Sequence, residues 1–386
     1  MATKKDDDIV TALTAEQKSL LDDALKETDP LPQFVETGNV GLDLALTDGK
    51  GLPLGSSILL WAKPGCGKTT VVTDTCRRLI KKYKAKGEAF KCLYLAVESS
   101  RSLMSALGMD EYIASGDFLY IPRRLCWRQI ETFYQGVLRG HDGYKDVKLI
   151  VIDSINNVLS DQNTKSSIAD GDFGTRAKER YNFYSKYLPL CKEKGITSFF
   201  ISQVRRKQNT LNQHEDPNKA AVSEGDMHNV DIIIKCSASN TDADASRIEE
   251  ETVFGKDRVA SKCVFKMDSK ATDCKNRYIK GNAVSLLFEK GKCVWNYYTV
   301  KKLLEGHKLI KGSGWYSFDA DLCKACGLPD VKLRREDLNE VIQEHVGELV
   351  NFLKEIGKYK VSIRETEVPV TDEDIQNAAN EEEEEE

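Results

Sequence analysis

The sequence predicts an α/β protein with a central, mostly parallel β-sheet. Seven apolar runs have the length of a strand: 57–61, 92–97, 149–152, 197–202, 231–236, 263–267 and 283–288. The first four are separated by amphipathic stretches long enough for a helix, which is typical of a parallel sheet covered by helices on both faces. The last three follow one another at shorter spacing, so we expect hairpins at one edge of this sheet.

The first element expected along the chain is a short amphipathic helix ahead of the sheet. Its start at Thr14 fits a capping box, Leu21 and Leu25 lie at helical spacing, and Pro30 follows as a breaker. The apolar face of this helix must pack on the chain's own core or on a neighbouring subunit. We therefore assign 1–33 to an N-terminal oligomerisation helix and linker.

The main domain is expected to span 34–296, and a small α/β domain to follow at 297–363. Within the main domain, 237–258 is polar and rich in Asp, Glu and Ser, which predicts an exposed hairpin loop. Within the small domain, 337–356 places its apolar residues on one helical face, which predicts a single helix. A tail at 364–386 is expected to be disordered because of its composition.

Charge is distributed unevenly between the body of the chain and its end. The 386 residues carry 56 Lys and Arg against 61 Asp and Glu, a net charge of −5. Eleven of the acidic residues and no basic ones lie between Glu365 and Glu386, which leaves a net charge of +6 on the rest of the chain. This acidic block is interpreted either as a solubility tail or as a competitor for an anionic ligand of the basic body.

Composition argues against a membrane protein and against a secreted one. No apolar run reaches the roughly 20 residues of a spanning helix, and no apolar stretch follows the first residues as in a secretory signal. We expect a cytoplasmic protein whose eleven cysteines are reduced. Cys323 and Cys326 have the spacing of half a zinc site, but no second pair completes four ligands, so no metal or redox role is assigned to them.

The strongest motif joins the first strand of the sheet to a helix expected at 71–81. A nucleotide phosphate is expected to be held by Ala62, Lys63, Pro64, Gly65, Cys66, Gly67, Lys68, Thr69 and Thr70. This is the P-loop pattern except that Ala62 replaces its first glycine. Gly65 and Gly67 let backbone N–H groups turn towards a phosphate, and the helix N-terminus adds its positive end. Lys68 is expected to reach the β- and γ-phosphates, and the Thr69 hydroxyl to hold Mg²⁺.

Three further strands end in polar residues suited to nucleotide hydrolysis. Asp153 is the expected partner of Thr69 in holding Mg²⁺, with an N-cap of the next segment as the alternative. Glu98 would polarise the attacking water as a general base. Gln203 would sense the γ-phosphate by hydrogen bonding and pass the signal to the loop that follows it.

With these residues in place, the chain resembles the RecA recombinase family in outline over about residues 34–320. The segments that carry the resemblance are, in order, 35–46, 51–55, the P-loop, 152–154, 200–205 and 309–318. The acidic tail also fits this family. Phage recombinases of the UvsX type are diverged to a similar degree, which is compatible with a viral origin.

The resemblance implies a RecA-type P-loop ATPase core that uses ATP and Mg²⁺. It implies filament formation on single-stranded DNA, homology search in double-stranded DNA, and strand exchange in recombination and repair. A homo-oligomeric filament in the cytoplasm at the nucleoid, or in the host cytoplasm if the chain is viral, would follow, with recombination mediators and single-strand-binding proteins as partners. Glu98 would be the catalytic base, and Gln203 would link ATP to the second of two DNA-binding loops, which are expected within 156–174 and 204–225.

Cations flank both expected loops. The candidate DNA-binding residues are Arg176, Lys178, Arg180, Arg205, Arg206 and Lys207. Each is interpreted as a phosphate contact or, alternatively, as part of a solvated basic turn. The resemblance also implies that Lys266 and Lys270 reach the ATP of an adjacent subunit and stabilise charge there. The family pair is separated by one residue and this pair by three, so Lys270 is alternatively a surface lysine.

Departures from the family pattern leave two other functions open. Residues 99–108 contain no tyrosine to stack on adenine, so Leu103 or Met104 is expected to pack against the base. The alternatives are a RecA-fold ATPase with another role, such as a helicase-type motor or a regulatory ATPase, and a filament scaffold that binds ATP without hydrolysing it. The C-terminal match argues against the first, and the presence of Glu98 and Gln203 argues against the second.

Overall fold

The computed structural model describes the greater part of the chain. The described residues are 32–161, 173–206, 218–220, 224–239, 244, 246–252, 255–271, 273–289 and 292–360. The expected N-terminal helix, the acidic tail and most of the two expected DNA-binding loops lie outside them. No helix within the described ranges is both long and apolar enough to cross a membrane.

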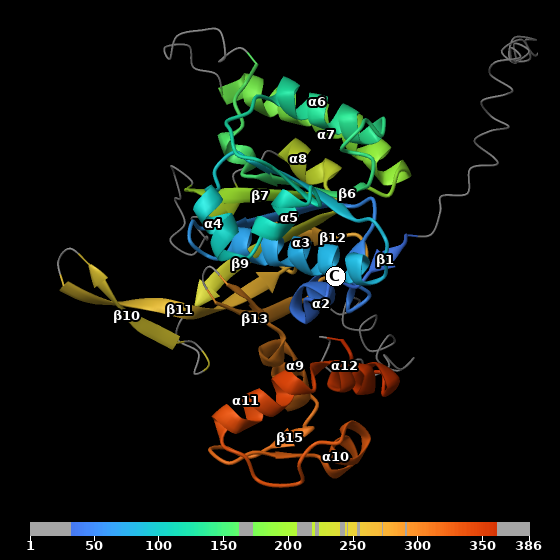
Figure 1. Cartoon of the computed structure of the whole chain (residues 1–386). Coiled ribbons are helices and arrows are strands. Elements are labelled where there is room, and N and C mark those ends of the chain that lie inside the picture. Colours follow the sequence, from blue (N-terminus) through green and yellow to red (C-terminus); the bar gives the residue numbers. More distant parts are fainter. Residues whose placement is uncertain are drawn as a thin grey trace, which may run out of the picture. The chain divides into compact units, whose positions relative to one another are not determined.

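A mixed, mostly parallel sheet forms the centre of the fold. Its main strands are β3 (Ser57–Ala62), β4 (Lys91–Ala96), β5 (Phe118–Ile121), β6 (Val147–Asp153), β7 (Thr197–Arg206), β9 (Ile232–Ser239), β11 (Gly255–Asp268), β13 (Ala283–Glu289) and β14 (Cys293–Trp295). They lie in the order β14-β13-β11-β9-β3-β7-β6-β4-β5 (Figure 1). The six strands from β9 to β5 pair in parallel, whereas β11, β13 and β14 are added antiparallel at one side. The predicted fold class and the hairpins at one edge are therefore confirmed.

Shorter strands extend this sheet. They are β8 (Asn218–Ala220) beside β7, β10 (Ser246–Thr252) beside β11, and β12 (Lys275–Asn276) beside β9. The exposed loop predicted at 237–258 is wrong at its start, because 237–239 belong to β9. It is also wrong for its second half, because β10 and the first part of β11 form an antiparallel ladder there (Figure 1). A polar composition does not prevent such a ladder, since its hydrogen bonds join backbone groups and are independent of side-chain polarity.

Helices cover both faces of the sheet. They are α2 (Val40–Thr47), α3 (Lys68–Ala85), α4 (Arg101–Ala106), α5 (Asp110–Ala114), α6 (Trp127–Leu138), α7 (Phe173–Glu193) and α8 (Glu224–Asn229). A separate two-stranded sheet is formed by β1 (Phe34–Val35), which precedes α2 in the sequence, and β2 (Leu52–Pro53), which follows it. Strand β3 divides its side chains between two cores as the period of two requires. Ile58 and Leu60 join the core under α3, whereas Leu59 and Trp61 join the core under α6 and α7.

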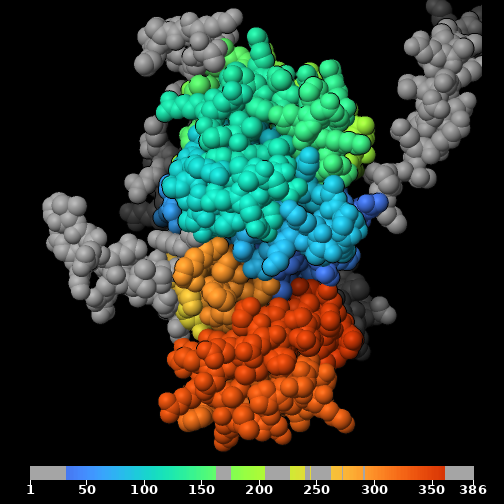
Figure 2. Space-filling model, in the orientation of Figure 1, coloured from blue at the N-terminus to red at the C-terminus, as the bar shows by residue number. Residues whose placement is uncertain are grey.

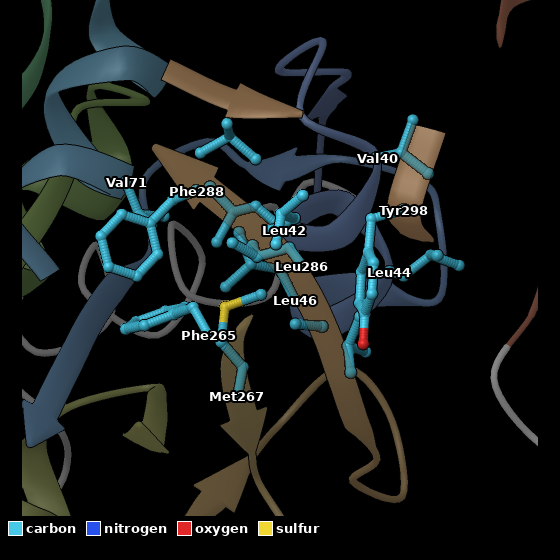
Figure 3. Close-up of a cluster of buried hydrophobic side chains, with 14 of the residues drawn as sticks. Val40, Leu42, Leu44, Leu46, Val71, Phe265, Met267, Leu286, Phe288 and Tyr298 are labelled. Carbon is cyan, nitrogen blue, oxygen red and sulfur yellow. The ribbon is translucent and has the colours of Figure 1, made fainter. Parts of the chain in front are cut away.

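The core under α3 continues to the antiparallel side of the sheet. Figure 3 shows Val71 of α3 beside Phe288 of β13, with Phe265 of β11 and Leu42 of α2 in the same cluster. The Phe265 and Phe288 rings meet edge to face, with their centroids 6.1 Å apart. This packing joins the P-loop helix to the antiparallel strands in one apolar body.

The C-terminal part is a small α/β unit. It consists of α9 (Asn296–Gly306), β15 (Ile310–Lys311), β16 (Ser317–Phe318), α10 (Ala320–Cys326), α11 (Arg335–Glu344) and α12 (Val346–Glu355), shown in orange to red in Figure 2. The single helix predicted at 337–356 is wrong, because the helix is interrupted at His345, which ends α11 and precedes α12. The buried residues Leu338 and Ile342 precede the break, and Leu349 and Leu353 follow it. Their spacing is helical throughout, so periodicity could not reveal the change of direction.

Candidate active site

The residues predicted to bind and hydrolyse the nucleotide meet at the carboxyl ends of four adjacent parallel strands. The register pairs Ala62 of β3 with Gln203 of β7, and Asp153 of β6 with Ala96 of β4. Asp153 also faces Ile201 of β7. Parallel strands place their carboxyl ends at one edge of a sheet, which is where ligands bind in open α/β folds. The order β3-β7-β6-β4 therefore brings together residues that are far apart in the sequence.

The loop between β3 and α3 has the backbone of a phosphate cradle. Gly65 and Gly67 have φ angles of 75° and 98°, in the left-handed region that favours glycine. Gly67 is also the N-cap of α3, and a Cβ atom there would lie 2.6 Å from the Phe288 ring. Lys63, Pro64 and Gly65 are exposed, so the loop is open to a ligand at the N-terminus of α3.

Lys68 lies folded back into this loop. Its ammonium group donates to the carbonyl oxygens of Ala62 and Lys63, both at 3.0 Å, and the residue is 7% exposed. Burial lowers the pKa of Lys68 from its ordinary value. The ammonium thus stands at the centre of the loop, bonded to neutral carbonyls that a phosphate oxygen could replace with a stronger, charge-assisted bond.

Asp153 is the most heavily hydrogen-bonded carboxylate of the edge. Its Oδ2 atom accepts from the hydroxyls of Thr69 at 2.8 Å, Tyr94 at 2.7 Å and Ser99 at 2.5 Å. Asp153 is 3% exposed and Tyr94 is completely buried. Burial, and then the negative charge of Asp153, raises the pKa of Tyr94 well above its ordinary value, so the phenol remains a donor.

The contact between Thr69 and Asp153 joins the two residues predicted to hold Mg²⁺. Hydroxyl and carboxylate oxygens are the ligands that Mg²⁺ prefers, and this ion commonly uses one or two protein groups together with waters and substrate phosphates. The donor set therefore fits the ion.

Glu98 and Gln203, which are both expected from the sequence to face the nucleotide, are hydrogen-bonded to each other. The amide Nε2 of Gln203 lies 2.7 Å and 2.9 Å from the two carboxylate oxygens of Glu98. Asn157 donates its amide to the same carboxylate at 3.1 Å. The backbone N–H of Glu98 donates to the carbonyl of Asp153 at 2.9 Å, which positions the start of the segment after β4.

Lys266 and Lys270 lie outside this cluster of hydrogen bonds. Lys266 is exposed on β11, which β9 separates from β3, and its ammonium lies 3.7 Å from the Asp268 carboxylate. The backbone N–H of Lys270 donates to Asp268, and its side chain is exposed. Their role towards an adjacent subunit remains a prediction.

The candidate DNA-binding cations differ in accessibility. On α7, Lys178 is exposed and Arg176 is partly exposed, whereas Arg180 is only 8% exposed. Arg180 is thus placed to support the fold in this conformation, while the other two can face a ligand. Arg205 and Arg206 end β7, and Val204 separates them from Gln203. Lys207 and the side chains of these two arginines lie outside the described residues.

Several residues of the site were missed by the sequence analysis. Tyr94 was read only as part of an apolar strand, and Asn156 and Asn157 only as part of a polar loop. The available signal for the asparagines was two amides within four residues of Asp153, at the carboxyl end of a buried strand. For the adenine, Met104 is completely buried in the core, so only Leu103 of the two candidates retains exposed surface.

The cysteine pair that the sequence singles out lies in the small domain. Cys323 and Cys326 are both buried on α10. Within the described part of the chain, no group of three or more His, Cys, Asp or Glu side chains is arranged to hold a metal ion.

Comparison with known proteins supports the fold. A family model described as an AAA domain matches residues 47–209. The chain is 24% identical over 315 residues to the protein RecA of Mycoplasma pneumoniae, which covers 80% of this chain and 81% of that protein. It is 27% and 30% identical to the DNA repair proteins RadA of Aquifex aeolicus and Campylobacter jejuni, over 44% and 43% of this chain. These matches span only 33% and 32% of the two RadA proteins. The chain thus has the fold of a RecA-type P-loop ATPase core.

Proposed function

We propose that this protein is an ATP-dependent DNA recombinase that forms filaments on single-stranded DNA and catalyses homologous pairing and strand exchange. The observation that carries the proposal is the hydrogen bonding between Glu98 and Gln203. It joins the candidate base directly to strand β7, which ends in Arg205 and Arg206, two and three residues after Gln203. A DNA phosphate bound beyond Gln203 could therefore alter the group that activates water.

The residues at the carboxyl ends of the parallel strands have separate roles in ATP hydrolysis. The loop from Ala62 to Thr70 cradles the phosphates, and Lys68 exchanges its carbonyl partners for phosphate oxygens. Thr69 and Asp153 would hold Mg²⁺, which would supply charge neutralisation for the phosphates. Glu98 orients the attacking water and accepts its proton, while Gln203 reports whether the γ-phosphate is present.

The assembly and partners belong to the same proposal. The N-terminal helix would bridge subunits through a heterologous contact, which produces open filaments when the rotation does not close. Lys266, and Lys270 if it reaches far enough, would contact the ATP of the adjacent subunit. Single- and double-stranded DNA would be the ligands of the basic body, in the cytoplasm, with mediator and single-strand-binding proteins as further partners. The likeness to a RecA protein over most of both chains supports this assignment.

A second candidate function is a DNA-repair ATPase that does not exchange strands. The similarity to RadA proteins, confined to less than half of this chain, favours it. The two candidates differ in one measurable product. A recombinase converts single-stranded DNA and a homologous duplex into joint molecules, whereas the alternative hydrolyses ATP without forming them.

The proposal is tested by measuring ATP turnover with and without single-stranded DNA, together with electron microscopy of the same mixtures. We expect DNA to raise turnover and filaments to appear with ATP and DNA. Lys68→Ala should remove both effects, while Lys81→Ala, at an exposed position of the same helix, should keep them. Equal turnover with and without DNA would refute a DNA-dependent ATPase, and filaments without joint molecules would favour the second candidate.

A further inference from the structure

We infer that Asn156 and Asn157 are positioning residues that hold Glu98 and Gln203 in a resting arrangement. The inference rests on the proposed function, because it concerns the group assigned as the base. The two asparagines belong to a short 3-10 turn (Ile155–Asn157), which Ser154 separates from Asp153. The Asn157 side chain contacts Glu98 and the Asn156 side chain contacts Gln203, so one turn of backbone positions both residues.

Asn157 shares the Glu98 carboxylate with Gln203. Its Nδ2 atom donates to Glu98 Oε2 at 3.1 Å, where Gln203 Nε2 also approaches at 2.9 Å. Gln203 Nε2 lies 2.7 Å from the other oxygen, Oε1. The carboxylate therefore receives amide N–H groups from two separate segments, the turn after β6 and the end of β7. Bonds to an ionised acceptor are stronger than bonds between neutral groups.

Asn156 holds the other end of the same arrangement. Its Oδ1 atom accepts from the backbone N–H of Gln203 at 2.7 Å and from the Ser202 hydroxyl at 3.0 Å. The turn itself is fixed by a bond from Asn157 N–H to the Ser154 carbonyl at 3.1 Å and by the buried side chain of Ile155. The turn and β7 are thus joined in two places, once through Asn156 and once through the carboxylate of Glu98.

The chemical consequence follows from the lone pairs of the carboxylate. An ionised carboxylate has about four acceptor positions, and amide N–H groups compete for them with a water molecule. A base that must orient water and take its proton is therefore less effective while both amides remain bound. A ligand that displaces the turn or the end of β7 would free Glu98. The pair of asparagines would accordingly keep turnover low until such a ligand binds.

The test is steady-state ATP hydrolysis by the full chain carrying Asn157→Ala, with Asn157→Asp as a variant of equal size that cannot donate. We expect turnover without DNA to rise roughly threefold to thirtyfold, as loss of one charge-assisted bond permits. The KM for ATP should change by less than about twofold, because the P-loop contacts are untouched. The ratio of DNA-stimulated to basal turnover should fall. Asn351→Ala, on the exposed surface of α12, is the matched control.

A double-mutant cycle separates this role from a purely structural one. In a Glu98→Gln background, Asn157→Ala should leave the residual turnover unchanged, since the carboxylate it acts through is gone. Basal turnover that is unchanged or reduced in Asn157→Ala, in a protein with the thermal stability of the wild type, would overturn the inference. Wild-type turnover that does not respond to DNA would refute the proposed function instead, and the basal rates of the variants would still decide the role of Asn157.

Discussion

Two carboxylates on neighbouring strands of the sheet are held in opposite ways. Asp153, at the end of β6, is 3% exposed and accepts from three hydroxyl groups. Glu98, just beyond β4, is exposed and is bonded by the amides of Asn157 and Gln203. The main chains of the two residues are nonetheless linked by one hydrogen bond.

This difference in hydrogen-bond donors indicates which of the two carboxylates can exchange its partners. The donors to Asp153 include Tyr94, in the middle of a buried strand, and Thr69, in the first turn of α3. Tyr94 is completely buried, so it cannot move without disturbing the core. The donors to Glu98 lie where β7 and the turn after β6 leave the sheet. A fixed carboxylate suits a metal ion that must be held throughout the reaction, and an adjustable one suits a step that is switched on.

The largest effect is expected from Glu98→Gln. Turnover should fall about 10²- to 10⁴-fold, the usual contribution of a general base, because an amide cannot accept the proton of water. ATP binding should persist, and ATP-bound filaments should accumulate, measured by nucleotide titration and electron microscopy. Retention of most of the turnover would show that the exposed carboxylate of Glu98 is not the base. The functional contrast between an adjustable Glu98 and a fixed Asp153 would then be lost.

The next largest effect is expected from Lys68→Ala, which tests the phosphate-binding loop. ATP affinity should fall about 10- to 100-fold, which corresponds to a loss of about 1.4 to 2.7 kcal/mol of charge-assisted bonding to phosphate. Titration with a fluorescent ATP analogue measures it. Lys81→Ala on the same helix should bind as the wild type does, and equal affinity of Lys68→Ala would contradict the P-loop assignment.

A smaller effect is expected from Tyr94→Phe, which removes one hydroxyl from Asp153 and little volume. The Mg²⁺ concentration for half-maximal turnover should rise about tenfold, the lower range for loss of a partner that orients a metal ligand. Tyr134→Phe is the matched control, since its buried hydroxyl bonds Ser198 in the core under α6 and α7. An unchanged Mg²⁺ requirement would reduce Tyr94 to a packing role.

The smallest effect is expected from removing residues 365–386. Loss of eleven negative charges should strengthen DNA binding several-fold at about 50 mM salt and much less at about 200 mM, because screening weakens contacts between exposed charges. Fluorescence anisotropy with labelled single-stranded DNA measures it. If the full chain and the truncated chain bind DNA with equal affinity at each salt concentration, the tail is a solubility segment.

The amino-acid sequence by itself determined the layered sheet, the P-loop and the polar strand ends. Each of these is a local pattern: alternating apolar runs, glycines before a lysine, and a polar residue closing a buried strand. The strand β10 and the break at His345 were missed, because a backbone ladder and a change of helix direction leave no distinct local pattern.

Which strand ends become neighbours depends on the order of the strands in the folded sheet. The order β3-β7-β6-β4 sets Gln203 beside Glu98, and Tyr94 beneath Asp153, although 105 and 59 residues separate the members of these pairs. Spacing along the chain carries no record of which strands become neighbours. Hydrogen bonds between buried or charged groups depend on distances of about 3 Å, and such distances are fixed only when the helices and the sheet have packed together.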